Sequence, residues 1–169
     1  AGKVGLYRIE VGISAGTGKL KHVGGADGSL REAIGSAVGF LQWHKVPMGI
    51  ASVFDTTDFH IEAIDLLTNR ITCEAGIAVV VAIASAIKKT AVPPGLVILG
   101  DLSIQGNIKA VHSLVEPLQV AMENGAKRAL IPLENKRNFL EVSGDIVEKV
   151  DPVFYSDPQT AVLKALGLT

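Results

Sequence analysis

The sequence predicts an α/β or α+β fold in which helices pack over a mixed sheet. Segments with strand-like apolar alternation are interspersed with segments whose apolar residues recur at helical spacing. They do not form a regular β-α-β repeat, so we expect a mixed sheet and not an all-parallel one. With 169 residues, of which 48% are hydrophobic and 20% charged, the chain suits one domain with a substantial core.

The N-terminal half is expected to contain two strands and one helix. Residues 4–13 alternate between apolar and polar positions, which favours a strand, and residues 14–28 are rich in Gly and Lys, which favours a loop or irregular hairpin. Ser29 and Glu32 form a capping box, so a helix is predicted to begin there. Residues 58–64 are a second strand candidate. The helix carries an apolar stripe at Leu30, Ile34, Val38 and Leu41.

A buried helix and a short strand are predicted next. Thr72 is expected to cap a helix made largely of the apolar residues 75–87. Residues 96–100 read as a short buried strand, and the turn signals that follow are Gly100, Gly106 and Asn107.

The C-terminal part is expected to form two further helices around one strand. Ser113 and Glu116 form a second capping box, and the helix it opens should end at residues 124–125. Residues 126–132 are a strand candidate. A last helix is predicted to begin at Asp157-Pro158 and to end at Gly167.

Charge and cysteine content narrow the function classes. The net charge is −1 and no basic stripe is visible, so nucleic-acid binding by this part of a protein is not expected. Cys73 is the single cysteine and cannot form an internal disulfide, which favours a reducing compartment such as the cytoplasm. The apolar run at 75–87 is too short to span a bilayer, so no membrane partner is expected.

Residues 16–19 read GTGK, which invites comparison with a phosphate-binding loop. A Walker A loop needs Gly five positions before the second Gly and Ser or Thr after the Lys, but those positions hold Ile13 and Leu20. No nucleotide cofactor is therefore expected at this loop.

Asp58, His60 and Glu62 should share one face of a strand. Three such groups could bind a metal ion, but no second cluster has ligand spacing. A polar strand face near solvent is the favoured interpretation, and no metal is predicted.

The corner at residues 70–76, RITCEAG, holds two reactive side chains. Cys73 could be a thiolate nucleophile at a helix N-terminus, with His112 as its base. Nothing in the sequence ties His112 to Cys73, so a small, half-buried residue at a turn is favoured. Glu74 is expected in the first helical turn, where a carboxylate gains about 0.3–1 kcal/mol from the helix dipole. To act as a general base, Glu74 would need a second catalytic group, and the sequence does not identify one.

Residues 58–132 resemble the proteolytic domain of Lon proteases. In that family a D-[IV]-H-[IL] strand leads to P-S-A-G at a helix start, followed by G-[ED]-[IV]-[ST]-L-x-G, G-G-L-K-E-K and K-x-x-[LI]-[IL]-P. The matching phrases here are DFHI, CEAG, GDLSIQG and KRALIP. The resemblance runs from about residue 4 to residue 166. A closer similarity, in GLYRIEV and FYSDPQTAVLKALGL, is to the Lon-related proteins of BREX phage-defence systems.

The resemblance implies where a catalytic dyad would lie. Lon proteases use a serine nucleophile and a lysine base, and these positions fall on Glu74 and Val115. Ser103 falls on the hydroxyl residue that supports the lysine. A carboxylate attack would give a labile anhydride, and valine cannot accept a proton, so both chemical members of the dyad are absent. The remaining candidates for an unorthodox dyad are Thr72, Cys73, Ser103, Lys109, His112 and Ser113.

The resemblance also implies a setting for the domain. Residues 1–169 would be one Lon-like proteolytic domain, similar in fold to the second domain of ribosomal protein S5, at the C-terminal part of a longer AAA+ ATPase. ATP would bind only in a preceding ATPase domain, nucleic acid would be contacted only through other domains, and the protein would assemble as a homo-oligomer, a hexameric ring.

Three functions stay open at this point. The first is a non-catalytic domain for assembly or partner contact. The second is an active ATP-dependent peptidase with an unorthodox nucleophile. The third is a pseudoenzyme that binds a polypeptide in the old substrate groove.

Overall fold

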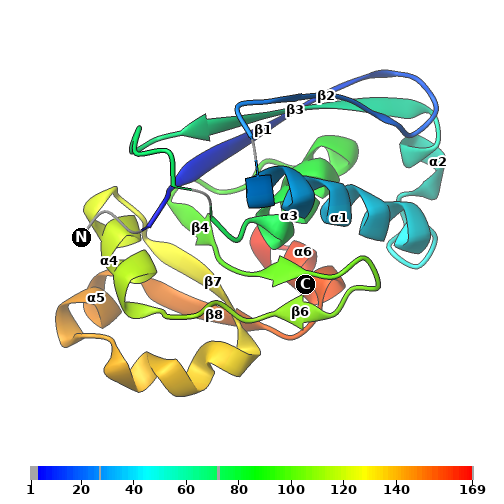
Figure 1. The fold of residues 1–169 in the computed structure, drawn as a ribbon. Helices are drawn as coiled ribbons and strands as arrows, with labels where there is room; N and C mark the ends of the chain where they lie inside the picture. Colours follow the sequence, from blue (N-terminus) through cyan, green and yellow to red (C-terminus); the bar gives the residue numbers. More distant parts are fainter. Residues whose placement is uncertain (1–3, 27, 72, 169) are drawn as a thin grey trace.

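The computed structural model describes residues 4–26, 28–71 and 73–168. Two three-stranded sheets and one short hairpin are packed with helices around two apolar cores (Figure 1). The predicted α/β fold class is therefore confirmed.

The first sheet is mixed. Its strands are β1 (Tyr7–Ala15), β2 (Leu20–Gly24) and β3 (Thr57–Asp65), in the order β1-β3-β2. β1 runs antiparallel to β3, and β2 runs parallel to it. The predicted strands at 4–13 and 58–64 are thus present. The loop prediction for 14–28 is wrong for β2, and because β3 lies between β1 and β2, these two strands do not form a hairpin.

The second sheet is parallel. Its strands are β4 (Leu96–Ile98), β7 (Arg128–Pro132) and β8 (Asp151–Tyr155), in the order β4-β7-β8. Two further short strands, β5 (Asp101–Leu102) and β6 (Ile108–Lys109), pair antiparallel as a separate hairpin. β4 follows the predicted strand at 96–100, and its residues are half-buried, not fully buried as expected.

Three helices form the main core with the first sheet. They are α1 (Gly28–His44), α3 (Gly76–Lys88) and α6 (Pro158–Leu166), and α3 contacts both other helices as well as β1. α3 is apolar on nearly all sides, as expected of a helix buried in the middle of a domain. α1 buries the predicted stripe through Leu30, Ile34 and Leu41, with Val38 partly buried beside the core.

Four shorter helices complete the fold. α2 (Ala51–Phe54) connects α1 to β3, while α4 (Val115–Glu123), a 3-10 helix η1 (Leu133–Glu141) and α5 (Gly144–Lys149) surround the second sheet. The second core, between these helices and the sheet, consists of Val111, Leu114, Leu118, Ala129, Ile131, Val142, Ile146 and Val150.

The helix predicted to begin at Ser29 is present, and α1 begins one residue earlier, at Gly28. The second predicted capping box, at Ser113, is wrong. α4 has Leu114 at its N-cap without a side-chain cap bond. Leu114 is only 1% exposed, so burial of its side chain in the second core fixes the start of α4 in place of a hydroxyl cap at Ser113. The predicted cap Thr72 lies outside the described residues.

The predicted helix ends at the C-terminal side are confirmed. Asp157 accepts a hydrogen bond from the Thr160 amide at 2.7 Å, and Pro158 follows as the first helical residue. Gly125 and Gly167 stop α4 and α6 with φ values of 90° and 67°, which glycine adopts readily.

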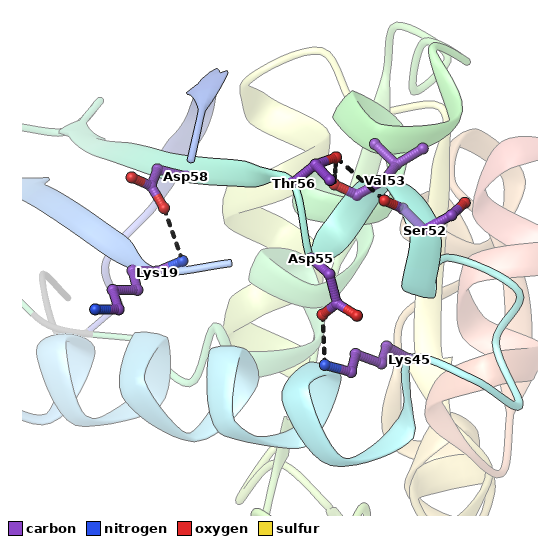
Figure 2. A network of polar contacts seen from close by, with 7 residues as sticks. All are labelled: Lys19, Lys45, Ser52, Val53, Asp55, Thr56 and Asp58. Carbon is purple, nitrogen blue, oxygen red and sulfur yellow. Dashed lines mark hydrogen bonds and ion pairs between the residues drawn. The ribbon is translucent and has the colours of Figure 1, made fainter. Parts of the chain in front are cut away.

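The backbone amides of the GTGK loop, residues 16–19, donate hydrogen bonds to acceptors within this chain. Gly16 and Gly18 donate to the carbonyls of Thr56 and Thr57, at 2.9 and 2.8 Å. The amides of Thr17 and Lys19 donate to Asp58 Oδ1, at 2.9 and 3.0 Å, and Figure 2 shows the Lys19 contact. A buried carboxylate of this chain therefore occupies the place where a phosphate loop would hold an anion.

The other polar residues of β3 are bound to neighbouring strands. His60 Nε2 lies 3.0 Å from Ser14 Oγ, and Glu62 lies 3.3 Å from His22 Nε2. Within the described ranges no group of three or more His, Cys, Asp or Glu could hold a metal ion. Likewise, no helix in these ranges is long and apolar enough to cross a membrane.

Polar contacts also fasten α2 between α1 and β3 (Figure 2). Lys45, just after α1, forms an ion pair with Asp55, and Thr56 Oγ1 donates to the carbonyls of Ser52 and Val53. The start of β3, and with it Asp58, is thereby fixed beside the end of α1.

We predict that Asp58 stabilises the fold in a pH-dependent way. The backbone hydrogen bonds from Thr17 and Lys19 hold the pKa of Asp58 below its ordinary value of 3.8. Its contribution is present above that value and is lost as pH falls through the folded-state pKa. Asp58→Asn keeps an acceptor oxygen and should lack this acid step in a melting-temperature series from pH 7 to pH 2. Asp58→Ala should melt about 5–10 °C lower at pH 7. An acid step that persists in Asp58→Asn would contradict this assignment.

Candidate functional site

A groove of about 740 Å³ lies where the two sheets meet α3 and α4. Residues 4–9 line one side, and residues 95–99 line another. The N-terminal part of α4 and the start of α3 complete the walls, with Cys73, Glu74, Ala78, Ala82, His112, Ser113, Glu116 and Pro117 among the lining residues. The lining is mainly apolar, with a few polar groups at one place, as is typical of a binding site.

Strand edges, and not strand faces, border this groove. Successive side chains of a strand point to opposite faces, so an uninterrupted run such as 95–99 can line a groove only along its edge. Among the described residues, β4 pairs with β7 alone and β1 pairs with β3 alone, so each is an edge strand of its sheet. The groove is therefore bordered by one edge strand from each sheet.

The corner at the start of α3 forms part of the groove wall. Ala75 is the N-cap and Gly76 the first helical residue, so Glu74 precedes the helix and the prediction of a first-turn carboxylate is wrong. The carboxylate that lies beside the first residue of α3 is that of Asp101: a Cβ added at Gly76 would stand only 2.0 Å from Asp101 Oδ1. The Ile77 amide donates to the carbonyl of Gly100 at 3.2 Å, which satisfies a free donor at the helix start.

Glu74 is half-buried and lies among mixed charges. Burial raises its pKa above the ordinary value, and repulsion by Asp101 adds to this, while the charges of His112 and Lys109 act in the opposite direction. Lys109 pairs directly with Asp101 across the β5-β6 hairpin, so both side chains point to the same face. Within the described part of the chain, no hydrogen bond or ion pair joins the Glu74 carboxylate to a partner.

Val115 differs from Glu74 in its surroundings. It is the first residue of α4 and packs against the second core. Among the described residues that line the groove, Glu74 and Glu116 are present and Val115 is not. The position that resembles the Lon lysine thus carries an apolar side chain directed into packing.

Cys73 lines the groove but is not activated. Burial, together with the charges of Asp101, Asp65 and Glu74, raises the pKa of its thiol to about 12. At neutral pH the side chain is the neutral thiol, which is a poor nucleophile. This favours the interpretation of Cys73 as a small residue packed against the core at a turn.

The remaining candidates are divided between the groove and the hairpin. His112 and Ser113 are exposed and line the groove. Ser103 is in the β5-β6 turn, where its Oγ accepts a hydrogen bond from the Asn107 amide at 3.1 Å. Ser103 therefore shapes a turn. Of the candidates that the structure describes, Cys73, Glu74, His112 and Ser113 line the groove, and Lys109 acts on Glu74 by charge.

Asn135 supports the site, and sequence reasoning did not identify it. It is only 2% exposed; its Oδ1 accepts from the Val111 amide and its Nδ2 donates to the Val111 carbonyl, both at 2.9 Å. This pair of bonds fixes the segment that places His112 beside the groove. A lone Asn in a polar segment carries no local signal of such a role, because its partner is distant in sequence.

Comparison with known proteins agrees with this geometry. The pattern that defines the Lon protease (S16) C-terminal proteolytic domain matches residues 2–167. The Lon-like protease BrxL of Escherichia coli O9:H4 (strain HS) is 31% identical over 169 residues, which cover 99% of this chain and 24% of that protein. The Lon-like protease BrxL of Bacillus cereus (strain H3081.97) is 29% identical over 168 residues, covering 99% and 25%.

A Lon protease is also similar to this chain. That of Buchnera aphidicola subsp. Schizaphis graminum (strain Sg) is 32% identical over 144 residues, covering 85% of this chain and 18% of that protein. The chain thus spans about a quarter or less of the length of these relatives. The resemblance seen in the sequence is confirmed, and the chain belongs to the family of the Lon protease (S16) C-terminal proteolytic domain.

Proposed function

We propose that this Lon-like domain does not hydrolyse peptide bonds and serves assembly and partner contact in a longer, ATP-dependent, ring-forming protein. The observation that carries the proposal is the chemistry at the dyad positions. Glu74 lies at the groove with a raised pKa, and Val115 packs against the second core. Neither side chain can act as the serine or the lysine of a Lon protease, and the thiol of Cys73 is not ionised at neutral pH.

The partner that best fits the groove is an extended polypeptide segment. An edge strand offers unpaired N–H and C=O groups, and an added strand binds by pairing with them. Here two edges, of β1 and β4, flank one mainly apolar groove. A segment held there could pair with backbone on either side, and without a dyad it would be held uncut.

The wider setting of the domain follows from the resemblance to Lon proteins. We propose a homo-oligomeric, hexameric ring located in the cytoplasm, in which ATP and nucleic acid are bound by other domains. This setting rests on the family to which the chain belongs.

One observation favours a second candidate, a peptidase with an unorthodox nucleophile. The charges of His112, which lines the groove, and of Lys109, in the β5-β6 hairpin, both act on Glu74, so an acid interacts with two basic groups. Such a group could move protons, but a nucleophile would have to be Cys73, Ser103 or Ser113.

A peptidase assay separates the two candidates. We expect the 169-residue chain, with a fluorogenic Lon substrate and ATP present or absent, to show only background hydrolysis. Cys73→Ala and Ser103→Ala should give the same background rate. An active Lon protease serves as the positive control. Turnover that one substitution abolishes would establish the second candidate and remove the first.

We predict that filling the groove prevents peptide binding. Ala82 lines the groove, whereas Ala86, one turn further along α3 and equally half-buried, is not among its lining residues. Ala82→Phe should weaken binding of a labelled, extended apolar peptide at least about tenfold in fluorescence anisotropy, and Ala86→Phe should leave it unchanged. N-methylation of alternate peptide amides should weaken binding too, since it blocks strand pairing. Equal affinity for both variants would refute the groove as the binding site.

We predict that ionised Glu74 destabilises the fold. Its pKa is raised above 4.5, so the charged form is disfavoured in the folded state, and stability is lost as pH rises through that folded-state pKa. Glu74→Gln should match the wild type below pH 4.5 and melt higher above it. The gain should be about 1 kcal/mol or less, because solvent screens a half-exposed carboxylate. Melting curves from pH 4 to 8 test this, and a variant that melts lower at neutral pH would indicate a favourable ion pair and support the second candidate.

A further inference from the structure

The groove between the two strand edges carries more acidic than basic charge. Its acidic side chains are Glu74 and Glu116, and of the lining residues that the structure describes only Arg8 is a Lys or Arg. Arg8 is already paired, because its Nε lies 3.2 Å from Glu10 Oε2, and Glu10 does not line the groove. A ligand of the groove therefore meets two carboxylates and no unpaired Lys or Arg.

Neither carboxylate is neutralised by a direct contact. Over the ranges that the structure describes, the side chains of Glu74 and Glu116 make no hydrogen bond and no ion pair. His112 and Lys109 act on Glu74 by charge only, and Lys109 also faces Asp101 across the β5-β6 hairpin. A cation that donates hydrogen bonds to such carboxylates gains more than a neutral donor does.

Glu74 lies where β4 leads into the β5-β6 hairpin. The Ile77 amide, in the first turn of α3, donates to the carbonyl of Gly100, which follows β4 closely in the chain. Gly76 lies against Asp101, the first residue of β5. The corner that holds Glu74 is therefore at the C-terminal end of β4.

α4 runs back along β4, which places Glu116 at this same end. The segment before α4 follows β6, which pairs with β5 directly after β4, and His112 in that segment acts on Glu74 by charge. Beyond the other end of α4, the Lys127 amide donates at 2.8 Å to the carbonyl of Gly95, at the start of β4. The first turn of α4, which contains Glu116, is therefore on the side of the Glu74 corner.

β4 offers free backbone groups that lead toward the two carboxylates. The carbonyl of Gly95 and the amide of Leu99 form their hydrogen bonds on the β7 side. Backbone groups alternate in direction along a strand of a parallel pair, so the N–H and C=O groups of Leu96 and Ile98 point to the open edge. A strand added at this edge passes between apolar walls and reaches the acidic end of the groove.

We infer that the groove selects an extended polypeptide segment that carries a lysine or arginine among apolar residues, with the basic side chain held by Glu74 and Glu116. The inference deepens the polypeptide contact proposed above and rests on it. The segment pairs with the free backbone groups of β4, and its apolar side chains pack on the groove walls. An Asp or Glu at the place of the lysine is repelled, so the same two carboxylates reject acidic segments.

Position-scanned peptides measure this selectivity. The probes are short labelled peptides of alternating Val and Thr in which Lys, norleucine or Glu occupies one position at a time. In fluorescence anisotropy with the 169-residue chain, Lys at the preferred position should bind about tenfold more tightly than norleucine, and Glu should bind more weakly than norleucine. The preference for Lys should shrink between about 0.05 M and about 0.5 M NaCl, because salt screens the charges.

Substitutions of the two acids assign the preference to them. Glu74→Gln and Glu116→Gln should each reduce the preference for Lys about threefold, and the double variant should bind the Lys and norleucine peptides equally. The matched control is Glu123→Gln. Glu123 is an exposed acid of the same helix as Glu116 but is not among the groove-lining residues, so this variant changes the net charge equally and should keep the preference.

The outcomes separate this inference from the proposed function. Equal affinity for Lys and norleucine peptides at every position overturns the inference and leaves the groove as a polypeptide site. A preference for Lys that the double variant retains also overturns it, because another group must then hold the cation. Peptides that bind with the expected preference and are then hydrolysed support the inference and remove the non-catalytic function. A chain that binds none of the peptides overturns both.

Discussion

The rest of the structure depends on the close approach of the chain at Gly100-Asp101 to the start of α3. Gly76 has no room for a Cβ beside Asp101, and Gly100 has none beside the hydroxyl of Tyr155. Tyr155, at the end of β8, donates to the Leu99 carbonyl at 2.5 Å, so the second sheet is tied to the same place. Burial raises the pKa of Tyr155, which keeps this donor protonated. This junction thus joins α3, the β5-β6 hairpin and the parallel β4-β7-β8 sheet. It thereby fixes the position of the strand edges that border the groove.

This junction explains why the shape of the corner does not depend on the side chain at residue 74. The Gly100 carbonyl accepts a hydrogen bond from the Ile77 amide at the helix start, and the Asp101 carboxylate lies close against Gly76. Glu74 lies just outside the helix and contributes no cap. A change at residue 74 therefore alters the chemistry of the groove while the helix, the hairpin and the two strand edges remain. The same reasoning holds for Val115, whose apolar side chain packs against an existing core.

The elements that sequence reasoning located have strong local periodicity or end signals. α1 and α3 were predictable from apolar spacing, and α6 from its Asp-Pro start and its Gly end. The errors occur where tertiary contacts decide. β2 looks like a Gly-Lys loop, and only pairing with β3 makes it a strand. β8 and η1 have weak local signals, and the start of α4 is set by burial of Leu114, so its Ser-x-x-Glu pattern misleads.

In the site, too, local sequence signals were predictable and tertiary contacts were not. The resemblance to Lon proteins located Glu74 and Val115, because motif order and spacing survive in the sequence. It could not indicate that Val115 packs against a core, that Ser103 shapes a turn, or that Asn135 holds the segment before His112. These three roles depend on where each side chain points in the folded structure, and the spacing of motifs along the sequence does not determine that. The groove itself emerges only when β1 and β4, far apart in the sequence, are both left as edge strands. Strand pairing uses backbone groups, so the two strand edges at this groove do not depend on which side chains stand at residues 74 and 115.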